Sequence, residues 1–327
     1  IEEPEKKVVD KVACDLEKNG DTYYVDSVCD LYALSYEVNE GNTYEGKKIE
    51  IRNDLDMGKI DKDTEKYINK HSDYFTEDNN KKINERFTPI GNNSHPFSGK
   101  VDGNIKYIKN LTIDKTGNDN VGIFGYVGET ASFEGINLEN ITVKGNESVG
   151  SLVGYAISNT DMTINEVVAK NINISGYQYV GGVIGYNGVI SNVIIKGGSV
   201  TASRSFAYGI QGWYWNSDFK VTNSIVENIT ITEPGNYYGA ISYYNNNSYY
   251  SNKTIMRGNK RTDGFDSEYI DDLDYYTNKV ETRLNGDKNN TGYYFDYVYS
   301  KGGIYLVNKY DKQESDDDTP SSQKIVR

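Results

Sequence analysis

The phrase Val121-Gly-Ile-Phe-Gly-Tyr126 recurs about every thirty residues along this 327-residue chain. Two close copies follow it, Val149-Gly-Ser-Leu-Val-Gly-Tyr155 and Val180-Gly-Gly-Val-Ile-Gly-Tyr186, and two degenerate copies end at Trp213 and Tyr243. Aligned on Gly125, Gly154, Gly185, Gly212 and Ser242, the copies lie 29, 31, 27 and 30 residues apart. A fixed period of this length, with β-branched residues and glycine, indicates coils of strands stacked on one another.

The period predicts the fold class. We expect an all-β protein, a right-handed parallel β-helix of about five or more coils, because crossovers between parallel strands take the right hand. Strands about 4.8 Å apart would give five coils a height of roughly 24 Å. A short N-terminal capping helix and a C-terminal β cap are expected over the open ends, whose backbone groups would otherwise be unpaired.

The position of a residue within the phrase predicts whether its side chain points inward. One column is apolar throughout and is expected inside: Ile123, Leu152, Val183, Ile210 and Ala240. Because side chains alternate across a strand, the next column is expected outside unless the chain bends there: Phe124, Val153, Ile184, Gln211 and Ile241. An aromatic column is also expected outside, as a ladder along one edge: Tyr126, Tyr155, Tyr186, Trp213 and Tyr243.

A second phrase keeps the same period. It begins with asparagine each time, at Asn110, Asn140, Asn171 and Asn228. Identical amides at equivalent positions of a stack can hydrogen-bond to one another, so we expect an asparagine ladder. Asn-x-Thr patterns at Asn110, Asn140 and Asn228 would also mark glycosylation in a eukaryotic secretory setting, but they are incidental in so asparagine-rich a chain.

Composition divides the chain into segments. Residues 1–57 are expected to form an N-terminal cap and the first strands, with a helix over 27–39 that Asp26-Ser27 caps and Gly41 ends. Residues 58–86 are charged and indicate an insertion with one or two short helices. Coils are expected over 87–244, followed by a Tyr- and Asn-rich C-terminal cap over 245–312 that contains a hairpin of 292–299 and 303–307. Residues 313–327 are acidic and indicate a linker to a further domain of a longer protein.

Charge and cysteine content limit the possible partners. The formal net charge is −13, which argues against nucleic acid because phosphate binding needs a basic stripe. No apolar run approaches the roughly 18 residues of a spanning helix, so no membrane insertion is expected. Cys14 and Cys29 either form a disulfide, worth roughly 3 kcal/mol for a loop of this length, or remain two buried thiols.

The repeated Gly-[Ile/Leu/Val]-x-Gly-Tyr phrase resembles the GLUG motif of bacterial cell-surface proteins. Phrases in the order expected before the repeats support the resemblance: Leu31-Tyr-Ala-Leu34, Asn53-Asp-Leu-Asp56, Phe87-Thr-Pro-Ile-Gly91, Pro96-Phe-Ser-Gly99 and Asp102-Gly-Asn104. The resemblance covers roughly residues 25–243 and departs at Ile105 and in the last two coils. It implies a right-handed parallel β-helix on large secreted or wall-attached proteins, including adhesin-like proteins and chains with IgA-specific metallopeptidase domains. It implies no catalytic residue.

Few residues suggest catalysis or metal binding. His71 and His95 do not form the His-Glu-x-x-His pattern of a zinc peptidase. An acidic cluster with basic neighbours could supply the carboxylate pair of a polysaccharide-cleaving enzyme, although a solvated loop explains it better: Asp266, Glu268, Asp271, Asp272 and Asp274 with Arg257, Lys260 and Arg261. Asp54, Asp56, Asp61 and Asp63 have enough oxygens for calcium but lack EF-hand spacing. We assign no catalytic residue, metal or cofactor.

The aromatic edge is the predicted binding site. It comprises Tyr126, Tyr155, Tyr186, Trp213, Trp215 and Tyr243, whose flat faces and polar rims suit sugar rings or protein partners. The alternative is a ladder that packs only on itself. The sequence therefore favours a non-catalytic, extracellular recognition, adhesion or spacer module, monomeric within a larger multidomain chain, that binds a host protein or glycan. An accessory substrate-recognition domain of a secreted protease and a β-helix polysaccharide-cleaving enzyme are the alternatives.

Overall fold

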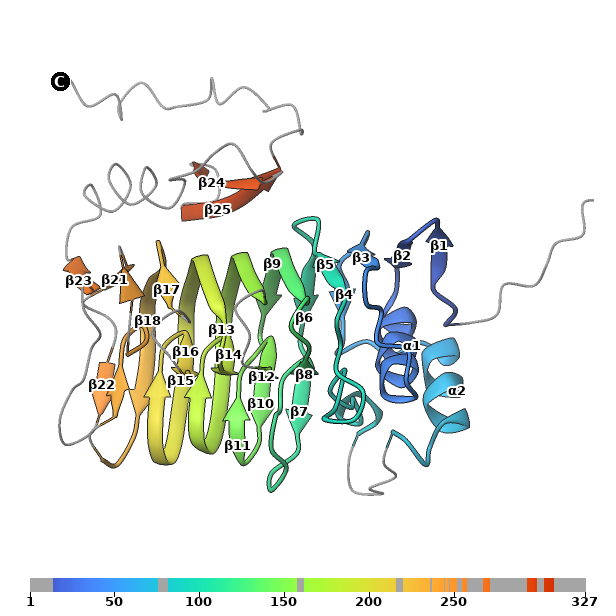
Figure 1. The fold of residues 1–327 in the computed structure, drawn as a ribbon, viewed down its shortest axis with the longest axis horizontal. Coiled ribbons are helices and arrows are strands. Elements are labelled where there is room, and N and C mark those ends of the chain that lie inside the picture. The colour runs from blue at the N-terminus through green and yellow to red at the C-terminus, as the bar shows by residue number, and fades with distance from the viewer. Residues whose placement is uncertain are drawn as a thin grey trace, which may run out of the picture.

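A computed structural model describes residues 14–75, 82–157, 162–215, 220–235 and 237–243, and beyond these the backbone of six short strands up to Asn308. Strands stack side by side along the long axis of the molecule, and the α-helices of the described residues lie at the N-terminal end (Figure 1). Apart from the antiparallel pairs β1–β2 and β24–β25, the described strands pair in parallel, often with an equivalent strand one coil later in the chain. The fold is therefore a β-helix-like parallel stack.

The stack begins with short strands separated by helical segments. The strands up to the first complete coil are β1 (Glu17–Asn19), β2 (Thr22–Val25), β3 (Lys48–Ile51), β4 (Leu55–Asp56), β5 (Lys100–Asp102), β6 (Tyr107–Lys109), β7 (Thr112–Asp114) and β8 (Phe124–Val127). Between them lie α1 (Val28–Asn39), α2 (Lys62–Lys70) and the 3-10 helix η1 (Ile83–Glu85). The parallel pairs β2–β3 and β3–β5 start the stack well before Phe87, because the insertion interrupts the sequence pattern but not the pairing.

The middle coils are the most regular. They contain β9 (Ser132–Glu139), β10 (Thr142–Lys144), β11 (Glu147–Val149), β12 (Val153–Ala156), β13 (Thr163–Gly181), β14 (Ile184–Tyr186), β15 (Val189–Tyr208) and β16 (Gln211–Trp213). Strands β8, β12, β14 and β16 form a separate parallel sheet along one side of the stack. This sheet carries the repeated phrase.

Parallel pairing continues past residue 244. The remaining strands are β17 (Val221–Thr222), β18 (Ile225–Thr232), β19 (Tyr238–Gly239), β20 (Asn245–Asn246), β21 (Ser248–Ser251), β22 (Ile255–Arg257), β23 (Ser267–Ile270), β24 (Tyr293–Val298) and β25 (Gly303–Asn308). Strands β20 to β22 pair with β17 and β18, although the glycine phrase has ended there. The predicted hairpin is confirmed as β24–β25, whose strands contact β13. The side chains of 245–327 lie outside the described part of the chain, so the C-terminal cap and linker remain predictions.

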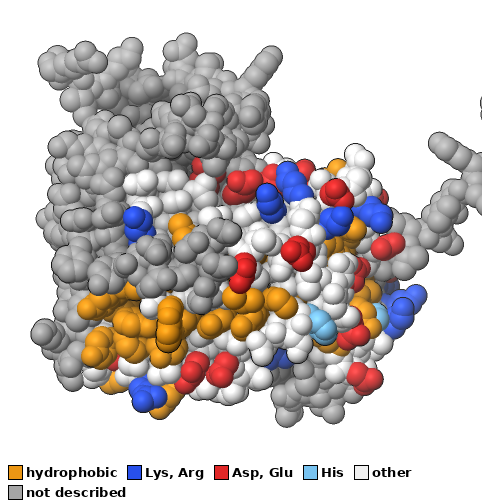
Figure 2. Space-filling view, viewed as in Figure 1, with side chains coloured by type: hydrophobic (Ala, Val, Ile, Leu, Met, Phe, Trp, Pro, Cys, Tyr) orange, Lys and Arg blue, Asp and Glu red, His pale blue; other side chains and the backbone are white. Residues whose placement is uncertain are grey.

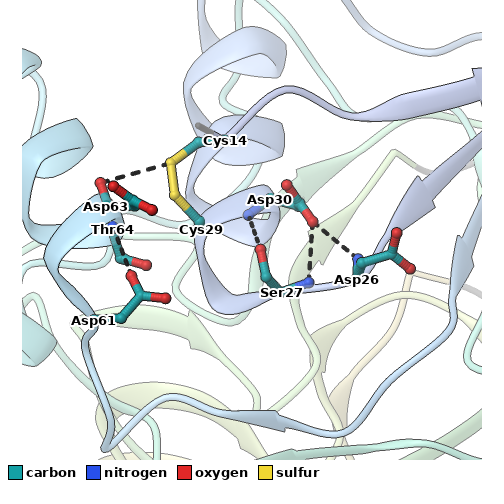
Figure 3. Close-up of a disulfide and its surroundings, with 8 residues drawn as sticks. All are labelled: Cys14, Asp26, Ser27, Cys29, Asp30, Asp61, Asp63 and Thr64. Carbon is teal, nitrogen blue, oxygen red and sulfur yellow. Dashed lines mark hydrogen bonds between the residues drawn. A yellow bond between two sulfur atoms is a disulfide. The ribbon is translucent and has the colours of Figure 1, made fainter. Parts of the chain in front are cut away.

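The N-terminal helix forms as predicted. Ser27 caps α1: its hydroxyl accepts from the Asp30 amide at 3.2 Å, and the Asp30 carboxylate accepts from the Ser27 amide at 3.0 Å (Figure 3). Gly41, at φ +117°, follows the helix and donates its amide to Val38. Cys14 and Cys29 form a disulfide, which joins the start of the described chain to the first turn of α1. The disulfide alternative is thus the correct one.

The prediction that one column of the repeated phrase faces solvent is wrong. Phe124, Val153, Ile184, Gln211 and Ile241 are at most 2% exposed, like the neighbouring inward column. The reason is a bend at Gly122–Ile123 and its equivalents, immediately before β8, β12, β14 and β16, which turns both columns into the interior. Gln211 is accommodated there because its amide donates to the Gly188 carbonyl at 3.0 Å and accepts from Ser242 at 3.2 Å.

The asparagine ladder is confirmed from Asn110 to Asn171 and does not include Asn228. The Asn140 amide donates to Asn110 at 3.0 Å, and the Asn171 amide donates to Asn140 at 3.3 Å. The Asn110 amide extends the ladder to Asp56 at 2.7 Å. These asparagines have φ between 52° and 59°, the left-handed region that asparagine tolerates well, and they form a corner of the coil. Gly197 takes the equivalent position in the coil between Asn171 and Asn228, and it interrupts the ladder before Asn228.

The bend can be tested through stability. Val183→Ala and Ile184→Ala should each lower the free energy of unfolding by about 1–4 kcal/mol, because both side chains leave a cavity in the core. Val189→Ala, at a half-buried position, should cost less than about 1 kcal/mol. Chemical denaturation measures all three. A straight strand would instead make Ile184→Ala as harmless as Val189→Ala.

Candidate functional site

The predicted aromatic ladder is formed by ring stacking between successive coils. The Tyr126 and Tyr155 ring centroids lie 4.8 Å apart at an interplanar angle of 21°, and those of Tyr155 and Tyr186 lie 5.2 Å apart at 10°. Register pairing places these tyrosines directly above one another on β8, β12 and β14, with Trp213 next on β16. The parallel register therefore converts the sequence repeat into a stack of three tyrosine rings, with Trp213 at the next register position.

In four of the five copies a glycine precedes the aromatic residue and lets the coils approach closely. A Cβ atom at Gly154 would lie 2.4 Å from the Asn120 carbonyl carbon, and one at Gly185 would lie 2.3 Å from that of Ser148. The glycine of one coil thus packs against a backbone corner of the coil before it. This contact explains why the first four copies keep glycine at that position while its neighbours vary; the last copy has Ser242.

A second aromatic column, which the sequence pattern did not reveal, lies beside the first. Tyr179, Phe206 and Tyr237 stand at that backbone corner in successive coils. Phe206 stacks between Tyr179 at 5.3 Å and Tyr237 at 4.7 Å. Tyr179 and Phe206 have φ of 57° and 63°, a conformation that is costly for bulky residues. The column was missed because the same corner holds Asn120 and Ser148 in earlier coils.

The two columns join into one surface, which we call the aromatic strip. The Tyr179 and Tyr186 rings meet edge to face at 5.2 Å, and the Phe206 and Trp213 rings lie 4.3 Å apart. Its members are Tyr126, Tyr155, Tyr186, Tyr179, Phe206, Trp213, Tyr237 and Tyr243. Figure 2 shows hydrophobic side chains gathered in a band across this face of the molecule.

Exposure of the strip increases toward its C-terminal end. Tyr237 is 46% exposed and Trp215 is 74% exposed, whereas the stacked tyrosines are half-buried. The Trp215 amide donates to the buried Asn187 side chain at 2.8 Å, which fixes the backbone that presents the indole. Arg204 lies over the exposed Tyr177 ring, 5.3 Å from its centroid, near the second column. Trp, Tyr and Arg are the residues most enriched in protein recognition sites.

Stacking changes what the strip offers to a ligand. Tyr155 lies between two rings that cover both of its faces, so the middle of the strip presents ring edges and hydroxyl groups. The sequence-based expectation of flat faces along the whole edge is therefore wrong for the stacked tyrosines. All six predicted site residues lie along or beside the strip, and their binding role remains a prediction.

The other candidate residues have local structural roles. Asp54 accepts from the Tyr107 amide, Asp56 accepts from Asn110, and Asp61 caps α2 through Thr64. Among the described residues no three His, Cys, Asp or Glu side chains form a group that could hold a metal, so the calcium hypothesis gains no support. His71 packs against the rings of Tyr36 and Tyr67, and His95 Nδ1 lies 2.8 Å from the Asn39 carbonyl oxygen. The acidic cluster around Asp266 lies outside the described side chains.

Comparisons with known proteins support the fold. No family model matches the chain, so the GLUG resemblance rests on the phrases quoted above. A stretch of 69 residues is 41% identical to halomucin of Haloquadratum walsbyi, which covers 21% of this chain and 1% of halomucin. The chain resembles the crystal structure of a Bacteroides ovatus protein described as a candidate immunoglobulin A1 protease, with a TM-score of 0.51, 14% identity, and coverage of 89% of this chain and 93% of that one. At this identity the likeness concerns the fold alone.

The stacked tyrosines should make stability depend on pH. Burial, followed by the neighbouring Tyr179 and Tyr155, raises the pKa of Tyr186 from 10.0 to about 12. The folded chain therefore holds this proton more tightly than the unfolded chain, and the free energy of unfolding should fall as pH rises above about 10. Tyr186→Phe should make this decline shallower, as measured by denaturation between pH 9 and 11. An unchanged slope would contradict the stacked environment.

Proposed function

We propose that this chain is a non-catalytic recognition module of a bacterial surface or secreted protein, and that a host protein binds along the aromatic strip. One observation carries the proposal: eight aromatic rings from successive coils form one surface, on which Tyr237 is exposed, and the exposed Trp215 follows the strip residue Trp213 by two positions. Packing within the strip does not require the Trp215 indole, which is 74% exposed. Tyrosine hydroxyls at the ring edges supply the polar contacts that protein interfaces combine with aromatic anchors.

A protein partner fits the middle of the strip better than a glycan. Sugars bind aromatic side chains through the ring face, and neighbouring rings already cover both faces of Tyr155. A protein surface can instead pack its own side chains against ring edges and around the Trp215 indole. A glycan bound along the whole strip is the competing outcome of the test described below.

The proposed setting is extracellular. The Cys14–Cys29 disulfide suits an oxidising environment. In the described part of the chain, no helix has the length and apolarity needed to cross a membrane. The GLUG-like phrases and the parallel stack together support a right-handed parallel β-helix of the kind carried by adhesin-like proteins. The module is proposed to act as a monomer within a longer chain, without nucleic acid or cofactor.

A second candidate function is an accessory substrate-recognition domain of a secreted protease. The fold likeness to the Bacteroides ovatus protein favours this candidate. Both proposed functions use the aromatic strip for binding, and they differ in the kind of protein that carries the module. A zinc-peptidase motif in the flanking sequence would select the accessory domain, because the chemistry would then lie in another domain.

Replacing Trp215 should weaken partner binding without lowering thermal stability. Trp215→Ala should weaken binding to a protein partner at least tenfold and leave the midpoint of thermal unfolding nearly unchanged, because the indole is 74% exposed. Partners would be sought on arrays of purified human secreted proteins and of glycans, and affinity measured by surface plasmon resonance. Asn173→Ala, at an exposed position on another face, is the matched control. Binding that survives Trp215→Ala and Tyr237→Ala together would refute the proposed surface.

A further inference from the structure

The aromatic stack has a free ring face only where it ends. Tyr126 is its first ring and stacks on Tyr155 on one side. Tyr126 also lines a groove of about 460 Å³ that opens at this end of the strip. That volume falls within the range of roughly 300–1,000 Å³ typical of small-ligand sites.

The groove exists because the preceding coil loops out below Tyr126. Ile90 forms a parallel β-bridge with Phe124, and Phe97 forms one with Val127. Between these two bridges the preceding coil has six residues, 91–96, whereas β8 has only two. Asn92 and His95 close this loop with mutual backbone hydrogen bonds of 3.0 and 3.2 Å. The loop 91–96 contains no Tyr, Phe or Trp that could continue the ladder beyond Tyr126.

The loop forms a firm wall of the groove. The Asn92 side chain donates to Asn39 Oδ1 at 2.7 Å, and the Asn39 amide donates to the Pro89 carbonyl at 2.9 Å. These bonds tie the loop to the end of α1. Because the amides of Asn39 and Asn92 hold the wall together, the groups that meet a ligand must come from elsewhere.

The opposite wall is the segment 115–120. The Asn118 amide donates to the Lys115 carbonyl at 2.8 Å, and Asp119 Oδ1 accepts from the Asn146 side chain at 2.8 Å and the Glu147 amide at 3.2 Å. Asp119 is thus held in place while a carboxylate retains further acceptor sites. Asn120 occupies the corner where later coils carry Tyr179 and Phe206, and its smaller side chain leaves the groove open.

The lining combines one aromatic ring with exposed polar groups. Tyr126, Val121 and Pro89 supply the apolar part, and the exposed Asn93, Asn118, Asp119 and Glu40 supply amides and carboxylates. A pyranose has the complementary form, with an apolar C–H face and a rim of hydroxyls that both donate and accept hydrogen bonds. We infer that the groove binds a neutral pyranose unit of an oligosaccharide, with its apolar face on Tyr126.

Charge selects neutral sugars over acidic ones. Two carboxylates, Glu40 and Asp119, line the groove together with one ammonium, Lys115. The net charge of −13 adds a repulsive field for polyanionic glycans. Sialylated or sulfated sugars are therefore poor ligands for this site. The inference adds a second site to the proposed recognition module and does not depend on a protein partner at Trp215.

The test measures binding of neutral and acidic oligosaccharides on a glycan array, followed by calorimetry with the best neutral binder. Tyr126→Phe should keep the affinity within about twofold because the ring face remains, whereas Tyr126→Ala should lower it at least tenfold. Asp119→Ala should also lower it. Asn93→Trp, on the exposed loop, should block the groove without disturbing the core, as thermal unfolding would confirm.

The inference is wrong if no neutral oligosaccharide binds the wild-type chain, or if binding persists in Asn93→Trp and Tyr126→Ala. Glycan binding that is lost in Trp215→Ala but kept in Asn93→Trp would also overturn it, because the sugar would then lie on the strip. Loss of a protein partner in Trp215→Ala, with sugar binding intact, leaves the groove assignment standing. These experiments can therefore refute either proposal while the other still stands.

Discussion

The structure depends on a single constraint: parallel hydrogen bonding holds each coil directly above the one before it. In the region of β9, β13 and β15, Phe133, Ile164 and Ile190 occupy one register position. The same register brings Gly154 against the backbone at Asn120, so close that any side chain would collide. Because successive coils are fixed at the spacing of strands, each column of side chains must stack on itself.

Self-stacking determines which chemistry remains available at the surface. Asparagine amides bond to one another at Asn110, Asn140 and Asn171, and tyrosine rings cover one another from Tyr126 to Tyr186. Most amide groups of the asparagine ladder and most ring faces of the tyrosine stack therefore contact one another and not a ligand. The two proposed recognition sites therefore lie where a column ends or bends, at the Tyr126 groove and around Trp215. The aromatic edge is both a structural element and a surface with two distinct ends.

The sequence predicted the repeated columns, the capped helix α1 and the hairpin β24–β25, and it missed features that depend on the path of the backbone. The period gave the parallel stack, the asparagine ladder and the first aromatic column, because identical residues at a fixed spacing must coincide in a stack. It misplaced Ile184, since alternation assumes a straight strand and the chain bends one residue earlier. It missed Tyr179 and Phe206 because that corner changes residue type between coils. The groove requires α1 and two loops to meet, which no local pattern encodes.

The register can be measured directly in solution. Thr112, Thr142, Asn173, Ser199 and Thr230 pair in succession, so Thr112 and Thr230 lie four strand spacings apart although 118 residues separate them in sequence. Nitroxide labels at cysteines introduced at these two positions should show, by pulsed electron paramagnetic resonance, a narrow distance distribution centred near 19 Å, widened by the label linkers. A broad distribution, or one centred beyond about 35 Å, would contradict a common axis, and with it both proposed sites.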